Sequence, residues 1–164
     1  MQLVKPDESH LVTIMKWFTT EQEVKSWAGP KFRYPYSQES FKEDLNHNST
    51  NSWSLTSEQG VLIAFGQYYL RLGKCHLGRL VVNPEFRGQG FISHLMEGIC
   101  KLGMNELAVE SCSLVVLESN ESAKKAYERF GFQVTDYPES IPSKHCLYMV
   151  KHKESPDKSI HPIS

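Results

Sequence analysis

The sequence predicts a mixed α/β domain built on one β-sheet. Strand-like and helix-like apolar patterns alternate along the chain in the order βααβββαβαββ. The 164 residues, 40% hydrophobic and 11% aromatic, suffice for one domain of ordinary size with a buried core. We expect this domain to span residues 1–150, and a polar, mobile tail to follow over residues 151–164.

The first part of the chain is predicted to contain a strand and two helices. The strand covers residues 2–5 and ends at Pro6. Residues 26–37, with two prolines, a glycine and four aromatic side chains, are expected to form a loop. Ser37 then caps the second helix. The first helix, over residues 9–24, is predicted from the helical spacing of Leu11, Ile14, Met15 and Phe18.

Strands dominate the middle of the chain. Residues 52–56 and 61–72 are rich in aromatic and branched side chains, and the turn-forming residues 57–60 separate them, which predicts an antiparallel hairpin. Another strand is expected over residues 74–83, where Pro84 ends it.

Helices and strands alternate in the last part. Residues 88–105 show the spacing of a long amphipathic helix, and residues 113–117 form a short apolar run typical of a buried strand. A compact helix is expected over residues 120–130, closed by Gly131. The final strands are predicted near residues 132–135 and 145–150.

Composition argues against several classes of function. With 18 basic and 19 acidic residues, the net charge of −1 gives no electrostatic reason to expect binding to nucleic acid or a membrane surface. The longest apolar run, residues 61–65, is far below the ~20 residues of a membrane span. The N-terminus lacks the apolar region of a secretory signal, so we expect a cytoplasmic protein. The four cysteines include no C-x-x-C pair and the seven histidines are scattered, so no metal is expected.

The most informative stretch is Val81-Val82-Asn83-Pro84-Glu85-Phe86-Arg87-Gly88-Gln89-Gly90-Phe91-Ile92. A predicted strand runs into a glycine-containing turn that opens directly into a helix, and backbone amides at such a helix start favour phosphate oxygens. A plain helix start is the simpler alternative. A Rossmann motif is excluded because Ser93 occupies the place of its third glycine, and no Gly-Lys-Ser/Thr follows as in a Walker loop.

A second motif lies ~30 residues further on, where Asn-x-x-Ala-x-x-x-Tyr-x-x-x-Gly-Phe runs from Asn120 to Phe132. Together with Arg87-Gly88-Gln89-Gly90, it resembles the GNAT superfamily of N-acetyltransferases over residues 76–134. The resemblance implies a three-layer mixed α+β fold, in which a mostly antiparallel sheet of roughly six to seven strands is flanked by about four helices. It also implies strands that splay apart at the cofactor site, and acetyl-CoA as the acyl donor.

The resemblance further implies which residues bind coenzyme A. Backbone amides of the glycine turn would face the pyrophosphate, although Glu85 replaces the usual Gln or Arg and Ile92 stands where Gly or Ala is common. The strand before the turn would pair with the pantetheine amides. Asn120 would contact the cofactor arm, with a helix cap as its alternative role. The implied cofactor-binding residues are Leu80, Val81, Val82, Arg87, Gly88, Gln89, Gly90, Phe91, Ile92, Asn120 and Tyr127.

Two residues are candidates for proton transfer. Family members use the tyrosine at the position of Tyr127 to protonate the departing thiolate; a core tyrosine is the alternative. A lysine-type amine has a pKa of ~10.4, so a base must supply its neutral form. His76 occupies the place of the family's glutamate base, and strict alternation would put it on one face with Gly78, Leu80 and Val82. A partly exposed strand histidine is the alternative, and Glu85 and Glu118 are other candidate bases.

The sequence thus predicts an N-acetyltransferase that moves an acetyl group directly from acetyl-CoA to a primary amine. A catalytically silent acyl-CoA-binding sensor and a nucleotide-binding regulator are the alternatives. The absence of a strong acidic cluster disfavours a polyamine, but the sequence does not choose between protein amines and small molecules. Self-association as a homodimer is common in the family, and no interface is identifiable. In the family's acceptor region this chain offers Trp27, Phe32, Arg33, Tyr34, Tyr36, Tyr68 and Tyr137.

Overall fold

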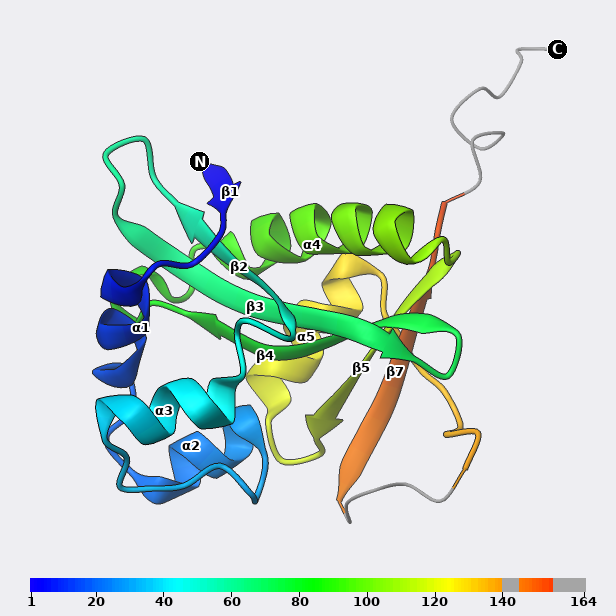
Figure 1. Ribbon diagram of the computed structural model, residues 1–164. Coiled ribbons are helices and arrows are strands. Elements are labelled where there is room, and N and C mark those ends of the chain that lie inside the picture. The colour runs from blue at the N-terminus through cyan, green and yellow to red at the C-terminus, as the bar shows by residue number, and fades with distance from the viewer. Residues whose placement is uncertain (140–144, 155–164) are drawn as a thin grey trace, which may run out of the picture.

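The computed structural model describes residues 1–139 and 145–154 and shows a seven-stranded sheet with helices on both faces (Figure 1). This arrangement confirms the predicted mixed fold. The helices are α1 (Glu8–Met15), α2 (Glu21–Ala28), α3 (Gln38–Leu45), α4 (Phe91–Leu107) and α5 (Glu121–Phe130), with a short 3-10 helix at Pro84–Phe86. The strands are β1 (Gln2–Val4), β2 (Asn51–Thr56), β3 (Leu62–Arg71), β4 (Lys74–Val82), β5 (Ser111–Leu117), β6 (Gln133–Val134) and β7 (Cys146–His152).

The strands follow one another across the sheet in the order β1-β2-β3-β4-β5-β7-β6. All neighbours are antiparallel except β4 and β5, so the sheet is mostly antiparallel, as predicted. Two apolar clusters pack on it. One lies beneath α1, α2 and α3 and the other beneath α4 and α5, which gives the three layers of the fold.

The prediction of one helix over residues 9–24 is wrong, because the chain forms α1 and α2 there, with a break between them. Thr20 caps α2: its hydroxyl accepts from the backbone N–H of Glu23 at 3.1 Å, and the Glu23 carboxylate accepts from the N–H of Thr20 at 3.0 Å. This reciprocal capping begins a new helix in the middle of an apolar pattern that looks continuous. Consequently α2 extends to Ala28, into the predicted loop.

The other elements agree with the prediction to within a few residues. Ser37 caps α3, and Gly131 ends α5 with a left-handed conformation. At the C-terminal end, Lys151 and His152 belong to β7 rather than to a tail. The rest of the predicted tail from residue 155 onward lies outside the described residues.

Helix α4 holds the centre of the sheet through a close approach at Gly103. A methyl group there would meet the Cys75 sulfur and would lie 3.1 Å from the ring of Tyr68, and both residues are fully buried. Gly98, one and a half turns earlier, faces instead the flexible end of Leu3 on the short edge strand β1.

Gly103→Ala should therefore destabilise the fold by about 1–2 kcal/mol, because overpacking outweighs the gain of about 1 kcal/mol in helix propensity. Gly98→Ala is the matched control. It should leave stability nearly unchanged, since the Leu3 side chain can move aside. Urea unfolding measures both variants, and equal midpoints for the two would contradict this view of the α4 contact.

Candidate active site

A β-bulge in β4 shapes the centre of the molecule. Gln67 of β3 pairs with Gly78, but Phe65 pairs with Val81, so β4 contains one extra residue at this point. Arg79 lies within the bulge and has a φ of 51°, in the left-handed region that side chains rarely adopt. The bulge therefore changes which face of the sheet the following residues occupy.

This change corrects the expectation drawn from strict alternation. Leu80 and Val82 pack in the cluster beneath α4, whereas Val81 packs beneath α1 to α3. His76, which precedes the bulge on β4, borders a cavity beside α2 and α3 instead. It does not share a face with Leu80 and Val82, because the extra residue reverses the pattern.

Just before the bulge, β4 separates from β5. The two strands pair only at Cys75–Cys112 and His76–Ser113, and then diverge (Figure 1). Among the described strands, none pairs with the β5-facing edge of residues 78–82. A cavity of about 630 Å³ lies between the strands and reaches the starts of α4 and α5. We call it the inter-strand cavity. Its open strand edge offers backbone donors and acceptors to an extended ligand.

The start of α4 supplies the other end of this cavity. Gly88 and Gly90 have φ values of 78° and 80°, and no side chain caps the helix. Within the described residues, the backbone amides from Gly88 to Ile92 donate to no protein acceptor, and the first turn carries no acidic side chain. Free amides and the helix dipole together favour an anion here.

The structure brings nearly all predicted cofactor-binding residues to the inter-strand cavity; of them, only Gln89 does not line it. Asn120 caps α5, since its Oδ1 accepts from the Ala123 amide at 3.3 Å, and it also borders the cavity. The capping role and contact with a ligand are thus compatible, because the side-chain NH₂ group takes no part in the cap.

Tyr127 lines the same cavity from α5. Burial raises the pKa of its phenol to about 12, so the hydroxyl is protonated at neutral pH. Within the described chain this hydroxyl has no hydrogen-bond partner, which leaves its proton available to a ligand in the cavity.

His76 lies elsewhere and is 4% exposed. Its Nδ1 is 2.9 Å from the Ser113 hydroxyl, and its ring packs 5.2 Å from the ring of Tyr69. Burial, reinforced by the charge of Arg71, lowers its pKa to about 4, so the imidazole is neutral at physiological pH. It does not border the inter-strand cavity with Tyr127. The other candidate bases, Glu85 and Glu118, line neither cavity.

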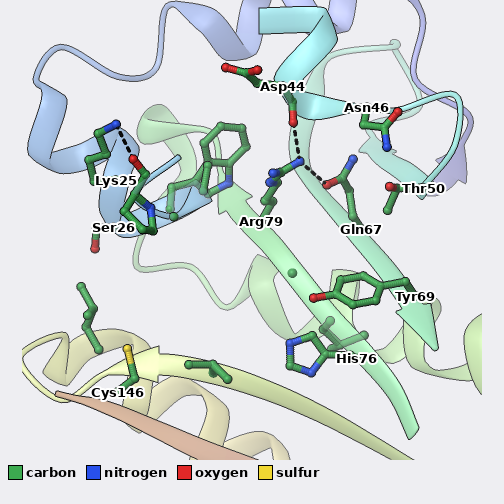
Figure 2. Close-up of a pocket in the computed structure, with 18 of the residues that line it drawn as sticks. Lys25, Ser26, Asp44, Asn46, Thr50, Gln67, Tyr69, His76, Arg79 and Cys146 are labelled. Carbon is green, nitrogen blue, oxygen red and sulfur yellow. Dashed lines mark hydrogen bonds between the residues drawn. The ribbon is translucent and has the colours of Figure 1, made fainter. Parts of the chain in front are cut away.

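The cavity that His76 borders measures about 860 Å³ and lies between β4 and the helices α2 and α3 (Figure 2). We call it the helix-side cavity. It adjoins the inter-strand cavity, because the two share part of their lining. The shared residues are Ser26, Trp27, Leu77, Gly78, Arg79, Val115 and Leu117. A second molecule in the helix-side cavity would therefore meet a ligand of the inter-strand cavity at β4.

Most aromatic residues expected at the acceptor side do not line this space. Trp27 does, but Phe32, Tyr34 and Tyr36 belong to the apolar cluster beneath α1 to α3. Tyr68 lies on the opposite face, where its hydroxyl donates to Glu106 at 2.8 Å.

Sequence reasoning missed most polar residues of the helix-side cavity, among them Gln67, Tyr69 and Arg79. Arg79 could have been identified as a candidate site residue from the sequence, because it is a charged residue within the otherwise apolar stretch from Leu77 to Val82.

Among the described residues, no group of three or more His, Cys, Asp or Glu side chains is placed to hold a metal ion. None of the helices described here is long and apolar enough to cross a membrane.

Comparison with known proteins gives a family match and a set of similar folds. The model of the acetyltransferase (GNAT) family matches residues 21–132. A PaiA N-acetyltransferase from Thermoplasma acidophilum, solved with coenzyme A, is 21% identical over 92% of this chain and 98% of its own, with a TM-score of 0.69.

Two further solved structures resemble the chain to a similar degree. Spermidine N-acetyltransferase from Vibrio cholerae, in complex with CoA and spermine, is 19% identical over 93% of this chain and 95% of its own, with a TM-score of 0.70. The ribosomal-protein-S18-alanine N-acetyltransferase from Escherichia coli is 20% identical over 94% and 95%, with a TM-score of 0.62. At these identities, the similarity shows a shared fold.

The buried His76 should make stability depend on pH. Its pKa is about 4 when folded against an ordinary value of 6.5, so the unfolded chain binds more protons between these values. The free energy of unfolding that the neutral His76 contributes is fully present above pH 6.5. It decreases as the pH falls, by about 3 kcal/mol near pH 4. Urea unfolding from about pH 7 to about pH 4 should show a smaller loss for His76→Gln than for the wild type.

The matched control is His94→Gln, at an exposed histidine on α4, which should keep the wild-type dependence. Parallel curves for the wild type and His76→Gln would show that His76 is not buried as described.

Proposed function

The chain belongs to the acetyltransferase (GNAT) family, and we propose that it transfers an acetyl group from acetyl-CoA directly to a primary amine. The observation that carries this proposal is the inter-strand cavity, which joins the open edge of β4 to the uncapped start of α4. Coenzyme A has matching parts: a pyrophosphate for the free amides and an amide-bearing pantetheine arm for the strand edge.

The chain's own residues would divide the work along the cavity. Backbone amides from Arg87 to Ile92 hold the pyrophosphate, with the Arg87 side chain at the rim. The backbone of Leu80, Val81 and Val82 pairs with the pantetheine arm, and an N–H of this stretch polarises the thioester carbonyl. Asn120 contacts the arm from α5. These roles need mostly backbone groups, so Glu85 and Ile92 do not prevent them.

Proton movements fall to two neutral side chains. The amine attacks the thioester carbon, a C–N bond forms, and the C–S bond breaks. Tyr127 gives its proton to the departing thiolate, which its raised pKa and unpartnered hydroxyl allow. His76 takes the proton from the amine at the side of the helix-side cavity, in the neutral form that a base requires. Its low pKa makes it a weak base.

The alternative is a silent acyl-CoA-binding module, which the separation of His76 from the inter-strand cavity favours. The enzyme is the better-supported proposal, because a binding module needs neither the unpartnered hydroxyl of Tyr127 nor a second cavity that opens beside the first.

The first test incubates the protein with acetyl-CoA and a panel of amines, peptides and amino acids, and follows release of free thiol. We expect release that depends on the acceptor, and calorimetry should show binding of acetyl-CoA. Binding without release for any acceptor would support the silent module. An absence of binding would overturn the assignment of the inter-strand cavity.

Tyr127→Phe should lower kcat by at least about 10-fold, since general acid catalysis typically contributes 10²–10⁴. The affinity for acetyl-CoA, measured by calorimetry, should stay the same. Tyr148→Phe is the matched control, because it also removes an unpartnered tyrosine hydroxyl, one that is buried outside both cavities. A fall of less than twofold for Tyr127→Phe would remove Tyr127 as the acid.

A further inference from the structure

Arg79 occupies the junction of the two cavities and is fixed on one side only. Its Nη1 donates to the backbone oxygen of Asp44 at 2.9 Å and to Gln67 Oε1 at 3.3 Å (Figure 2). It also donates to the backbone oxygen of Leu45 at 2.9 Å. The guanidinium also packs 5.4 Å from the centre of the Phe32 ring. These contacts hold the side chain in one orientation.

The rest of the guanidinium is free. Within the described chain, Nε and Nη2 of Arg79 donate to no acceptor, although this side chain lines both cavities. Trp27 adds a second donor at the same junction, since its buried Nε1 also has no partner there. N–H groups without acceptors on a fixed fork are suited to a ligand that carries oxygen atoms.

The carboxylates that line the helix-side cavity, Glu43 and Asp44, do not accept from the free N–H groups of Arg79. Arg33 binds Asp44 through its backbone N–H, Nε and Nη2, at 2.9 to 3.0 Å, and binds Glu43 through Nη2 at 2.8 Å. Lys25, the other cation of the helix-side cavity, donates to the carbonyl oxygens of Pro30 and Phe32. Thus both carboxylates of the cavity are already paired with Arg33, and Nε and Nη2 of Arg79 remain available to a ligand.

The burial of Arg79 also favours an anionic ligand. It lowers the pKa of Arg79, yet an arginine remains charged at neutral pH. The Asp44 carboxylate attracts Arg79 but forms its ion pair with Arg33. A carboxylate that binds the half-buried guanidinium in a bidentate manner would therefore compensate its burial further.

We infer that Arg79 binds a carboxylate of the acceptor, and that the acceptor is therefore a compact amine with a nearby carboxylate, such as a free amino acid. This inference rests on the proposed acetyl transfer. Arg79 directly precedes Leu80, the start of the strand edge assigned to the acetyl donor. Arg79 also lines both cavities, so a carboxylate on its free donors would lie at the junction where an acceptor meets the acetyl donor. In an α-amino acid the carboxylate and the amine are attached to the same carbon, which suits a site where the two must lie close together.

The same geometry argues against a polyamine. A polyamine brings several positive charges to a cavity whose junction already holds a cation, and it needs free carboxylates to bind them. Glu43 and Asp44 are held by Arg33 instead. This chain therefore differs in its acceptor chemistry from the spermidine enzyme that shares its fold.

The test compares the free L-amino acids, their C-terminal amides and spermidine as acceptors, by thiol release from acetyl-CoA. We expect at least one amino acid to be used with a kcat/KM about 10-fold or more above that of its amide, because the amide lacks the charge. Arg79→Gln should remove this preference mainly through a higher KM. Lys25→Gln, which deletes the other cation of the cavity, should keep the preference.

Since Nη1 of Arg79 also supports the end of α3, Arg79→Gln is checked by its thermal unfolding and its affinity for acetyl-CoA. The comparison of acid with amide in the wild type needs no variant and stands by itself. Amides or spermidine that are used as well as the acids would overturn the inference and leave the acetyltransferase intact. So would binding of acetyl-CoA without transfer to any amino acid. Loss of acetyl-CoA binding in the wild type would instead overturn the proposed function.

Discussion

The structure depends on one irregularity, the extra residue in β4. The bulge turns Arg79 toward α3, places Leu80 under α4, and comes just after β4 leaves β5. A sheet edge freed in this way would ordinarily invite unwanted pairing, and its polar groups need partners. Here the edge borders the inter-strand cavity, where a ligand can supply those partners.

Packing on both faces keeps the bulge in place. Gly66 lies opposite it on β3, and a side chain there would come within 2.7 Å of Leu80 and 3.3 Å of Ile99 on α4. On the other face, Arg79 holds the carbonyl oxygens at the end of α3 and packs against Phe32. The left-handed conformation at Arg79, costly by itself, is thereby stabilised from both sides.

Local signals explain what the sequence predicted well. Gly88, Gly90 and Gly131 all adopt positive φ values, and the caps at Ser37 and Asn120 act on their own helices, so neighbouring residues suffice to predict them. The bulge was out of reach, because Leu80, Val81 and Val82 after it are all apolar, so either face suits them and the pattern is the same with or without a shift. The break between α1 and α2 was accessible through the capping pattern of Thr20 and Glu23, but apolar spacing concealed it.

Burial shifts the pKa of three ionisable groups that line the two cavities, Tyr127, His76 and Arg79, with a different consequence for each. It raises the pKa of Tyr127 and lowers that of His76, so both are neutral, and one can give a proton while the other can take one. Arg79 alone of the three keeps its charge, because its pKa starts so high. A cavity with this arrangement could bind an anionic group at Arg79 without placing a charge at the proposed proton-transfer positions. If the proposed roles hold, it would favour a substrate whose negative charge and reacting amine are separate but adjacent.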